Sequence, residues 1–405
     1  MFDREVEISE AQRLILDIGT SIKSEVLPIS KALGRICAID IKTTIPSPPF
    51  DRSPFDGYAF LGEDTEGATK ENPVTLKINQ EIPAGFNPTA EISSGLAAKI
   101  LTGAPIPNGA NAVIKFEDTK FTTEEVTIFE SVKPGTNIVR AGEDVPSGTP
   151  LLEAGSEITP ALIGLLAAQG LEEITVFKKP VISVVNTGTE LIAPGNPLPE
   201  GKIYNSSMYT LHGFISEMGA DFIDGGIVPD DVDAINERIL EQQALSDMLI
   251  TTGGASVGDY DCAVRAAEKA GGEILFWKVK MKPGGSLLAY KLNDKLVLSL
   301  SGNPGAAILG LLRIGLPYIR KLCGRSDTLP EECMVHLKNE MKKKSPRTRI
   351  LRGYLQIEDG KAFFVENEGQ GGGDISSLIN FNLLGEVPEG SGPLPAGSLI
   401  KAYIV

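Results

Sequence analysis

Apolar positions in the second half of the chain follow two alternating patterns. Short apolar runs have the length and composition of buried strands, at residues 181–185, 221–223, 248–251 and 296–300. The segments beside them have the spacing of helices, at 206–218, 231–244, 261–270 and 304–321. Strands that alternate with helices predict a parallel, doubly wound sheet with helices on both faces. Ligands bind beyond the carboxyl ends of the strands in such a sheet, so the loops after these strands are candidate sites.

The first part of the chain predicts a helical domain into which a β domain is inserted. A helical pattern covers 7–33, with Ser9 as a possible N-cap and one apolar face formed by Ala11, Leu14, Ile15 and Ile18. A second helical stretch lies at 159–169. Residues 46–146 between them are rich in Pro, Gly, Thr and Val, with alternating runs at 74–78 and 125–129, which is typical of a small β domain.

The predicted fold class is α/β plus β in a multidomain chain, because 405 residues exceed one ordinary core. The last segment has short strands and Gly-rich turns and predicts a separate β domain. We expect four domains: a discontinuous helical domain at 1–45 and 147–178, an inserted β-rich domain at 46–146, an α/β domain at 179–325 and a C-terminal β domain at 326–405.

Composition excludes several classes of protein. No apolar run approaches the 18 residues of a membrane span, and Asp3, Glu5 and Glu7 stand where a signal peptide has a basic region, so we expect a cytoplasmic protein. Four cysteines without a CxxC pair and only two histidines argue against a zinc site. A net charge of -15 argues against nonspecific binding of nucleic acid.

The loop TTGGASVGDYD at 251–261 combines a Gly-Gly turn with two carboxylates. A strand, a glycine turn and a helix N-terminus form an anion site, because backbone N–H groups converge there. The expected phosphate-binding residues are Thr252, Gly253, Gly254, Ser256 and Gly258. Asp259 and Asp261 would act on a phosphate through a divalent cation, and oxygen ligands suit Mg²⁺. The alternative for this loop alone is a tight turn followed by an Asp cap.

Three more loops should gather at the same sheet edge. NTGTE at 186–190 carries Glu190, WKVKMKPGG at 277–285 carries Lys278 and Lys282, and SLSGNPGAA at 299–307 opens a helix with Gly302, Asn303 and Pro304. Backbone amides and two lysines can neutralise a phosphate or another tetrahedral oxyanion. The alternative for the lysines alone is a solvated charged strand.

Three loops of the inserted region are rich in turn residues, at 47–59, 101–114 and 139–145. Their polar side chains include Asp51, Asp56, Thr102, Glu143 and Asp144. Taken singly, each loop is more typical of structure than of a site, because Pro, Gly and Asp are ordinary turn residues. Tyr58 and Trp277 could stack on a planar ligand, although aromatic side chains more often belong to the core.

Together and in this order, these loops resemble the molybdopterin molybdenumtransferase family, the MoeA proteins, with the gephyrin E domain and the plant Cnx E domain as eukaryotic relatives. The matching segments are PPFDRSPFDGYA, LTGAPIPNGANAVI, RAGEDV, NTGTEL, TTGGASVGDYD, the turn at 278–284 and SGNP. The resemblance spans essentially the whole chain, whereas the molybdopterin adenylyltransferases resemble the α/β segment only.

The resemblance implies a Mg²⁺-dependent enzyme that uses molybdate to cleave adenylyl-molybdopterin, releasing AMP and leaving molybdenum on the pterin. It assigns catalytic roles to Asp56, Thr102, Asp144, Glu190, Lys278 and Lys282, and metal-binding roles to Asp261, Glu190 and Asp56. It also implies an elongated homodimer whose site is shared between subunits. The adenylyltransferase and apo-molybdoenzymes are the expected protein partners, and neither nucleic acid nor a membrane is expected.

This chain departs from the family pattern at several positions. The common KPGKP turn has Gly285 and Ser286 after its first three residues, which removes one positive charge. Cys262 replaces a common Tyr, and Gly372 stands where QGSG has a hydroxyl. The alternatives are a paralogue that uses tungstate, a non-catalytic dimeric scaffold like gephyrin, and a metal-dependent pyrophosphatase.

Overall fold

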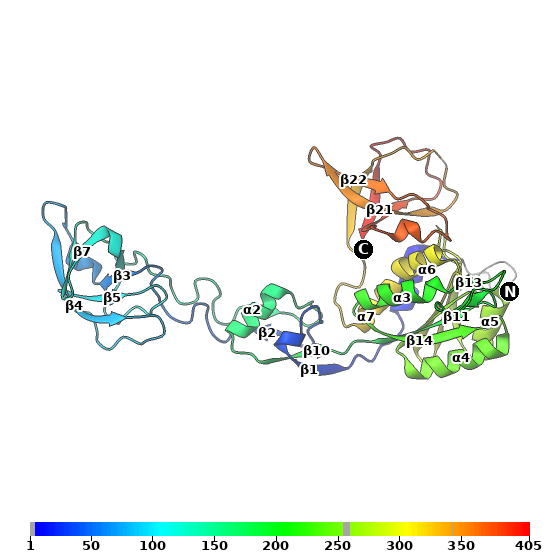
Figure 1. The fold of residues 1–405 in the computed structure, drawn as a ribbon, viewed down its shortest axis with the longest axis horizontal. Helices are drawn as coiled ribbons and strands as arrows, with labels where there is room; N and C mark the ends of the chain where they lie inside the picture. The colour runs from blue at the N-terminus through cyan, green and yellow to red at the C-terminus, as the bar shows by residue number, and fades with distance from the viewer. Residues whose placement is uncertain (1–4, 254–259, 343) are drawn as a thin grey trace. The chain divides into compact units, whose positions relative to one another are not determined.

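The computed structural model describes residues 5–253, 260–342 and 344–405. The chain divides into two compact units (Figure 1). Unit 1 consists of Met1–Ile39, Ala154–Thr159 and Glu173–Val405, and unit 2 consists of Asp40–Glu153 and Pro160–Glu172.

The largest part of unit 1 is a six-stranded sheet in the order β14-β11-β15-β19-β18-β16. Its strands are β11 (Val181–Thr187), β14 (Asp221–Val228), β15 (Met248–Thr252), β16 (Glu273–Trp277), β18 (Leu288–Leu292) and β19 (Lys295–Leu300). The first four strands in that order are parallel, as the apolar runs predict, whereas β18 and β16 are antiparallel. The parallel pairing predicted for the four apolar strands is therefore confirmed, and two antiparallel strands that the sequence pattern did not reveal extend the sheet at this edge.

Helices cover both faces of this sheet, so the predicted doubly wound arrangement is confirmed (Figure 1). The helices of unit 1 are α1 (Ile8–Leu16), α3 (Ser206–Glu217), α4 (Val232–Leu245), α5 (Tyr260–Lys269), α6 (Pro304–Gly310) and α7 (Leu316–Leu322). Ile182 and Val184 pack with α1, α3, α6 and α7, and Val185 packs with α4 and α5 on the other face. Alternate residues of a strand point to opposite faces, so a strand buried on both sides is apolar throughout.

Two predicted helices differ from the structure. The helical pattern at 7–33 ends at Leu16, and Glu7 rather than Ser9 occupies the N-cap position of α1. The chain beyond it forms the strand β1 (Ser24–Pro28), because these residues pair with β10 (Glu173–Phe177), a long-range partner that periodicity does not reveal. The helix predicted at 304–321 is interrupted between α6 and α7 by the π-helical turn η4 (Leu311–Gly315).

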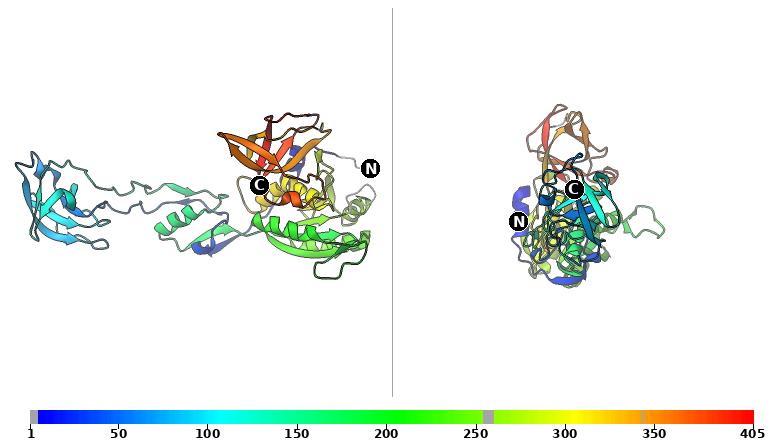
Figure 2. Two further views of the ribbon diagram at one scale, coloured as in Figure 1. Left: turned by 45° about the horizontal axis from the view of Figure 1, so that its top comes forward. Right: turned by 90° about the vertical axis from the view of Figure 1, so that its left-hand side faces the viewer.

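The C-terminal strands of unit 1 close into a barrel, drawn in orange and red in Figure 2. They are β20 (Glu332–Leu337), β21 (Thr348–Glu358), β22 (Lys361–Glu366), β23 (Leu383–Val387) and β24 (Leu399–Ile404), and β17 (Met281–Lys282) adds to β21. Buried Arg313 fastens the barrel to the helices, since its guanidinium lies 2.8 Å from the Glu386 carboxylate and stacks 3.5 Å from the centre of the Tyr403 ring. The β17–β21 pairing brings the barrel beside the lysine turn.

Unit 2 is built on a six-stranded sheet in the order β6-β3-β5-β4-β8-β7. Its elements are β2 (Ile41–Lys42), β3 (Gly57–Phe60), β4 (Val74–Ile82), β5 (Leu96–Ile100), β6 (Ala112–Lys115), β7 (Thr119–Phe121), β8 (Glu125–Ile128), β9 (Pro150–Leu152) and α2 (Pro160–Ala168). Tyr58 is fully buried in its core among Phe60, Leu76 and Val126. Tyr58 is therefore a core residue and does not present its ring to a ligand.

Smaller elements complete the chain. They are the two-stranded pair β12 (Leu191–Ile192) and β13 (Ile203–Tyr204) and the 3-10 turns η1 (Ile29–Lys31), η2 (Gly62–Thr65), η3 (Phe116–Asp118) and η5 (Ser376–Leu378). Over the described stretches of the chain, no helix combines the length and the apolar composition that crossing a membrane requires.

Candidate functional site

The turns after β11, β15 and β19 converge at the carboxyl edge of the sheet. Gly253 has φ 105°, and a Cβ added to it would lie 2.1 Å from the carbonyl oxygen of Thr187. A Cβ added to Gly302 would lie 3.2 Å from the Cα of Gly253. Side chains at 253 and 302 would separate these turns, so both glycines are needed for the turns to meet at one place. The predicted gathering of these loops is confirmed for Gly253 and Gly302.

A buried network of polar side chains joins the ends of β11 and β15 to the start of helix α3 at this edge. The Asn186 side-chain amide donates to the Thr252 hydroxyl, and the Asn205 amide donates to Asn186 Oδ1 at 3.0 Å. Asn205 also caps helix α3 by accepting from the Met208 N–H at 3.3 Å. Thr252, predicted to bind phosphate, is buried in this network and orients the turn instead of lining a cavity.

An acidic cavity of about 330 Å³ opens at the edge. Its walls include Glu190, Asp230, Gly253, the 301–304 turn and the first residues of α3. Asp230 accepts hydrogen bonds from the Thr189 N–H at 3.0 Å and hydroxyl at 3.1 Å, which fixes its carboxylate beside the Glu190 loop. The sequence interpretation missed Asp230, although its position just after β14 follows the same rule that identified the other loops.

A basic cavity of about 380 Å³ adjoins the acidic one. Lys278, Lys282 and Arg347 line it, and no carboxylate of a described residue does. The two cavities share three lining residues, Ser286, Ser301 and Asn303. The turn SGNP, predicted to bind substrate, therefore stands between a cationic wall and an anionic wall, with Pro304 at the first position of α6.

Lys278 has a strained backbone. Its φ is 71°, a left-handed conformation that costs a residue with a side chain about 1 to 2 kcal/mol. Bonds on both sides hold it: the Lys278 N–H donates to the Leu287 carbonyl at 2.8 Å and its own carbonyl accepts from the Val6 N–H at 3.1 Å. Strain that the surrounding bonds maintain is typical of functional positions.

The lysine turn requires glycine at both positions after Pro283. A Cβ at Gly284 would lie 2.9 Å from the Ala306 carbonyl oxygen of helix α6, and Gly284 has φ 92°. A Cβ at Gly285 would lie 2.3 Å from the carbonyl oxygens of both Val279 and Met281. A lysine at 285, as in the common family pattern, therefore does not fit this turn without a backbone shift.

The C-terminal barrel contributes Arg347 and Gly372 to the basic cavity. Arg347 forms an ion pair with Glu5, and its side chain is 43% exposed. Gly372 accepts from the Ala306 N–H at 2.8 Å, so its backbone lies on the start of α6. Arg347 supplies a third cation at the wall where position 285 supplies none. The sequence interpretation missed it because its place depends on the β17–β21 pairing.

In unit 2, the three loops predicted separately form one surface. Backbone bonds join Arg52 to Val139 at 2.9 and 3.0 Å, and the Ile106 N–H donates to the Asp51 carbonyl at 2.9 Å. The Asp51 carboxylate accepts from the Ala141 N–H at 2.8 Å and from the Arg140 guanidinium at 2.5 Å. Burial raises the pKa of Asp51, but these donors outweigh it and hold that pKa below its ordinary value. Asp51 therefore organises the surface.

Two predicted catalytic residues of this surface are bonded to each other. Asp56 Oδ1 accepts from the Thr102 N–H at 2.7 Å and from the Thr102 hydroxyl at 2.8 Å. These bonds hold the pKa of the exposed Asp56 below its ordinary value, so the group is a carboxylate at neutral pH. Asp144 accepts from the Ser47 hydroxyl at 3.4 Å, a long hydrogen bond at the rim of the surface.

The predicted site residues are thus found in two groups. Glu190, Lys278, Lys282, Gly302, Asn303 and Pro304 line the cavities of unit 1, and Asp56, Thr102 and Asp144 lie on unit 2. Gly254, Ser256, Gly258 and the side chain of Asp261 lie outside the described residues. Among the residues that are described, no three His, Cys, Asp or Glu side chains cluster as metal ligands.

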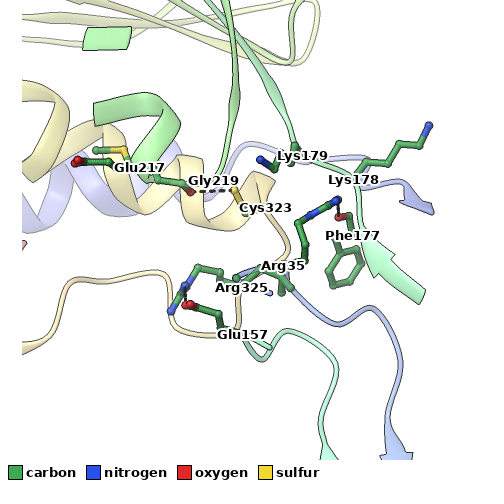
Figure 3. A pocket seen from close by; sticks show the side chains of 12 residues that line it. Arg35, Glu157, Phe177, Lys178, Lys179, Glu217, Gly219, Cys323 and Arg325 are labelled. Atoms are coloured by element: carbon green, nitrogen blue, oxygen red, sulfur yellow. Dashed lines mark hydrogen bonds and ion pairs between the residues drawn. The ribbon is translucent and has the colours of Figure 1, made fainter. Parts of the chain in front are cut away.

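A further cavity of about 190 Å³ lies at the junction between the β1–β10 pair and the ends of α3 and α7 (Figure 3). It contains none of the predicted site residues. Its arginines are already engaged: Arg35 donates to the Phe177 carbonyl at 2.8 Å and Arg325 pairs with Glu157 at 2.7 Å. We interpret it as a structural junction.

Comparison with known proteins covers both units. Three family models match the chain: the MoeA N-terminal region (domain I and II) at 6–170, the probable molybdopterin binding domain at 183–321 and the MoeA C-terminal region (domain IV) at 334–405. The fold and these matches define a protein of molybdenum cofactor biosynthesis, with an α/β molybdopterin-binding domain and a four-domain architecture.

Full-length relatives narrow this class to one family. The molybdopterin molybdenumtransferase of Bacillus subtilis (strain 168) is 33% identical, over 99% of this chain and 94% of that protein. The protein of the same name from Staphylococcus aureus (strain COL) is 31% identical, over 98% and 95%. The crystal structure of the molybdopterin biosynthesis moeA protein from Pyrococcus horikoshii OT3 has a TM-score of 0.84 at 30% identity, over 99% of this chain and all of that chain. The chain belongs to the molybdopterin molybdenumtransferase (MoeA) family.

Proposed function

We propose that this chain is a molybdopterin molybdenumtransferase, which inserts molybdenum from molybdate into adenylyl-molybdopterin and releases AMP. The observation that carries the proposal is the pair of adjoining cavities with opposite charge. The basic cavity suits a tetrahedral oxyanion, because Lys278, Lys282 and Arg347 offer charged donors without a lining carboxylate. The acidic cavity offers Glu190 and Asp230 on the other side of the same turn.

Charge separates the roles of these residues. Preorganised cations stabilise negative charge that develops when a phosphoanhydride is cleaved, and we assign this role to Lys278 and Lys282. Helix α6 begins between the cavities, and the positive end of its dipole favours an anion beside Asn303. The shared turn would thus hold the phosphate of the substrate next to molybdate.

Magnesium is the ion we propose for the acidic cavity. The donor set fits it, since Glu190 and Asp230 offer carboxylate oxygens and Mg²⁺ prefers oxygen ligands. Asp261 and Asp56 are the further candidates named from the sequence. When bound, the ion would neutralise phosphate oxygens.

AMP release tests the proposal directly. Purified protein with adenylyl-molybdopterin and Mg²⁺ should release AMP when molybdate is added, and Lys282→Gln and Glu190→Gln should each lower the rate about 100-fold. Lys280→Gln is the matched control, because Lys280 pairs with Glu7 at 2.7 Å and does not line either cavity. No AMP release with molybdate or with tungstate would refute the transferase. Release with tungstate alone would identify the oxyanion, and release without either would indicate a pyrophosphatase.

We further propose that the enzyme is a homodimer in which the unit 2 surface of one subunit completes the unit 1 site of its partner. Asp56→Asn and Lys282→Gln remove groups from the two surfaces separately. If the site is shared between subunits, mixing the two inactive variants should restore part of the AMP release. Unfolding and refolding the variants together, then assaying, measures this. No recovery from mixed dimers would refute a shared site.

A further inference from the structure

Two exposed apolar residues, Ile203 and Tyr204, are among the residues that line the acidic cavity. Ile203 is 55% exposed and Tyr204 is 43% exposed, and both line the cavity with Glu190 and Asp230. Exposed large apolar groups inside a concave polar site are informative, because ligand sites combine apolar surface with a few placed polar groups.

Strand β13, which carries Tyr204, is held in register with the Glu190 loop. The Ile203 N–H donates to the Glu190 carbonyl at 3.0 Å, so β13 is bonded to the residue that carries the predicted carboxylate. Tyr204 donates its hydroxyl to the Asn196 carbonyl at 2.9 Å, which ties the ring to the exposed loop between β12 and β13. Lys202 fastens the other end of that loop by donating to the Thr189 carbonyl at 2.6 Å. The ring is therefore fixed before any ligand binds.

The groups around the ring suit one kind of ligand. An aromatic face favours stacking with a planar ring, and carboxylates accept hydrogen bonds from ring amino groups. The N-terminus of α3, capped by Asn205, brings Ser206 and Ser207 to the same cavity, where backbone N–H groups favour a phosphate. A planar, amino-bearing heteroaromatic ring linked to a phosphate meets all three features.

We propose that Tyr204 is the stacking platform for the heteroaromatic ring of the substrate. This inference rests on the proposed function, whose substrate contains two such rings, adenine and pterin. The platform makes Tyr204 a specificity-determining residue that recognises the ring, while the lysines of the basic cavity recognise the oxyanion.

Three variants separate stacking from structural effects. Tyr204→Ala removes the ring, and Tyr204→Phe keeps the ring while it removes the bond to Asn196. Tyr209→Ala is the matched control, because Tyr209 is 57% exposed on helix α3, directly after β13, and does not line the cavity. Binding of AMP is measured by calorimetry, and binding of free pterin by quenching of its own fluorescence.

Tyr204→Ala should weaken binding of the stacked ring about ten-fold, since aromatic stacking on a base contributes roughly 1 to 3 kcal/mol. Tyr204→Phe should stay within about two-fold of the unmodified protein, and Tyr209→Ala should be unchanged. A loss confined to AMP assigns the platform to adenine, and a loss confined to pterin assigns it to the pterin. Unchanged binding of both probes by Tyr204→Ala would overturn the inference.

The outcomes also distinguish this inference from the proposed function. Molybdate binding by Tyr204→Ala should equal that of the unmodified protein, which shows that the variant is folded at the adjoining cavity. If AMP release is normal and Tyr204→Ala changes neither ring binding nor the KM for adenylyl-molybdopterin, the platform is wrong and the transferase stands. If the unmodified protein binds the rings but never releases AMP, the transferase is wrong.

Discussion

The strained backbone of Lys278 allows a test that separates the role of its side chain from the cost of its conformation. Lys278→Ala and Lys278→Gly both remove the ammonium from the basic cavity and its contact 4.7 Å from the centre of the Trp277 ring. The two variants differ in how well the new residue tolerates φ 71° and in the freedom of the unfolded chain. Their difference in stability therefore isolates the backbone term.

The expected magnitude follows from two opposing effects. A residue with a Cβ loses roughly 1 to 2 kcal/mol in the left-handed region, and glycine loses about 0.4 to 1 kcal/mol through its greater freedom in the unfolded chain. Lys278→Gly should therefore be more stable than Lys278→Ala by about 1 kcal/mol. Both variants should lose AMP release equally, by about 100-fold, because both lack the charge.

The fluorescence of Trp277 allows unfolding to be followed at the segment that contains Lys278. It is the only tryptophan in the chain and precedes Lys278, so its fluorescence during urea unfolding reports on this segment. If Lys278→Ala unfolds at the same urea concentration as Lys278→Gly or higher, positive φ at this position costs nothing and the reasoning fails. If the glycine variant retains AMP release, the ammonium has no role in the reaction.

Three further predictions follow from the ion pairs and pKa shifts. Glu5→Gln should strengthen molybdate binding about two- to five-fold in calorimetry, because it frees Arg347 from its ion pair. Arg347→Gln should weaken molybdate binding, and the opposite order of affinities would exclude Arg347 from the oxyanion site. Because the pKa of Asp56 is lowered, its stabilising bonds to Thr102 should persist at every pH above the ordinary pKa of 3.8 and be lost only as the pH falls through the lower pKa of the folded protein. The NMR shift of the Thr102 amide measures this, and a midpoint at or above pH 3.8 would contradict the prediction. Burial raises the pKa of the Cys323 thiol to about 11, so the neutral thiol stabilises the fold at pH 8 and this contribution is lost as pH rises toward 11. In mass spectrometry, iodoacetamide should therefore modify the half-buried Cys262 and Cys333 before it modifies Cys323.

Much of the fold was predictable because buried strands and helices have characteristic patterns of apolar residues. The four parallel strands of unit 1 were found from apolar runs, since a strand covered by helices on both faces is apolar at every position. The edge hairpin of β16 and β18 was not found, because its antiparallel pairing depends on neighbours rather than on periodicity. The stretch after Leu16 has a helical pattern but contains strand β1, because Ser24–Pro28 pairs with β10.

The predicted site was found in part. The loops with Glu190, Lys278 and Gly302 follow strands of one sheet, and the carboxyl ends of parallel strands meet at one edge whatever else the chain does. Asp230 obeys the same rule and was missed because its loop has no glycine signature. Arg347 lies in a different domain and reaches the cavity only through strand pairing, so no local pattern reveals it.

By itself the sequence determined the four parallel strands of unit 1 with the helices between them, the glycine turns and the family, because these depend on burial periodicity and on short motifs. Only the tertiary structure decided that a basic and an acidic cavity share the SGNP turn and that Tyr204 and Asp230 line the same cavity. It also decided that Lys278 is held at positive φ and that Gly285 leaves no room for a side chain. Each of these depends on distances between segments far apart in the chain, which packing sets and local composition does not encode.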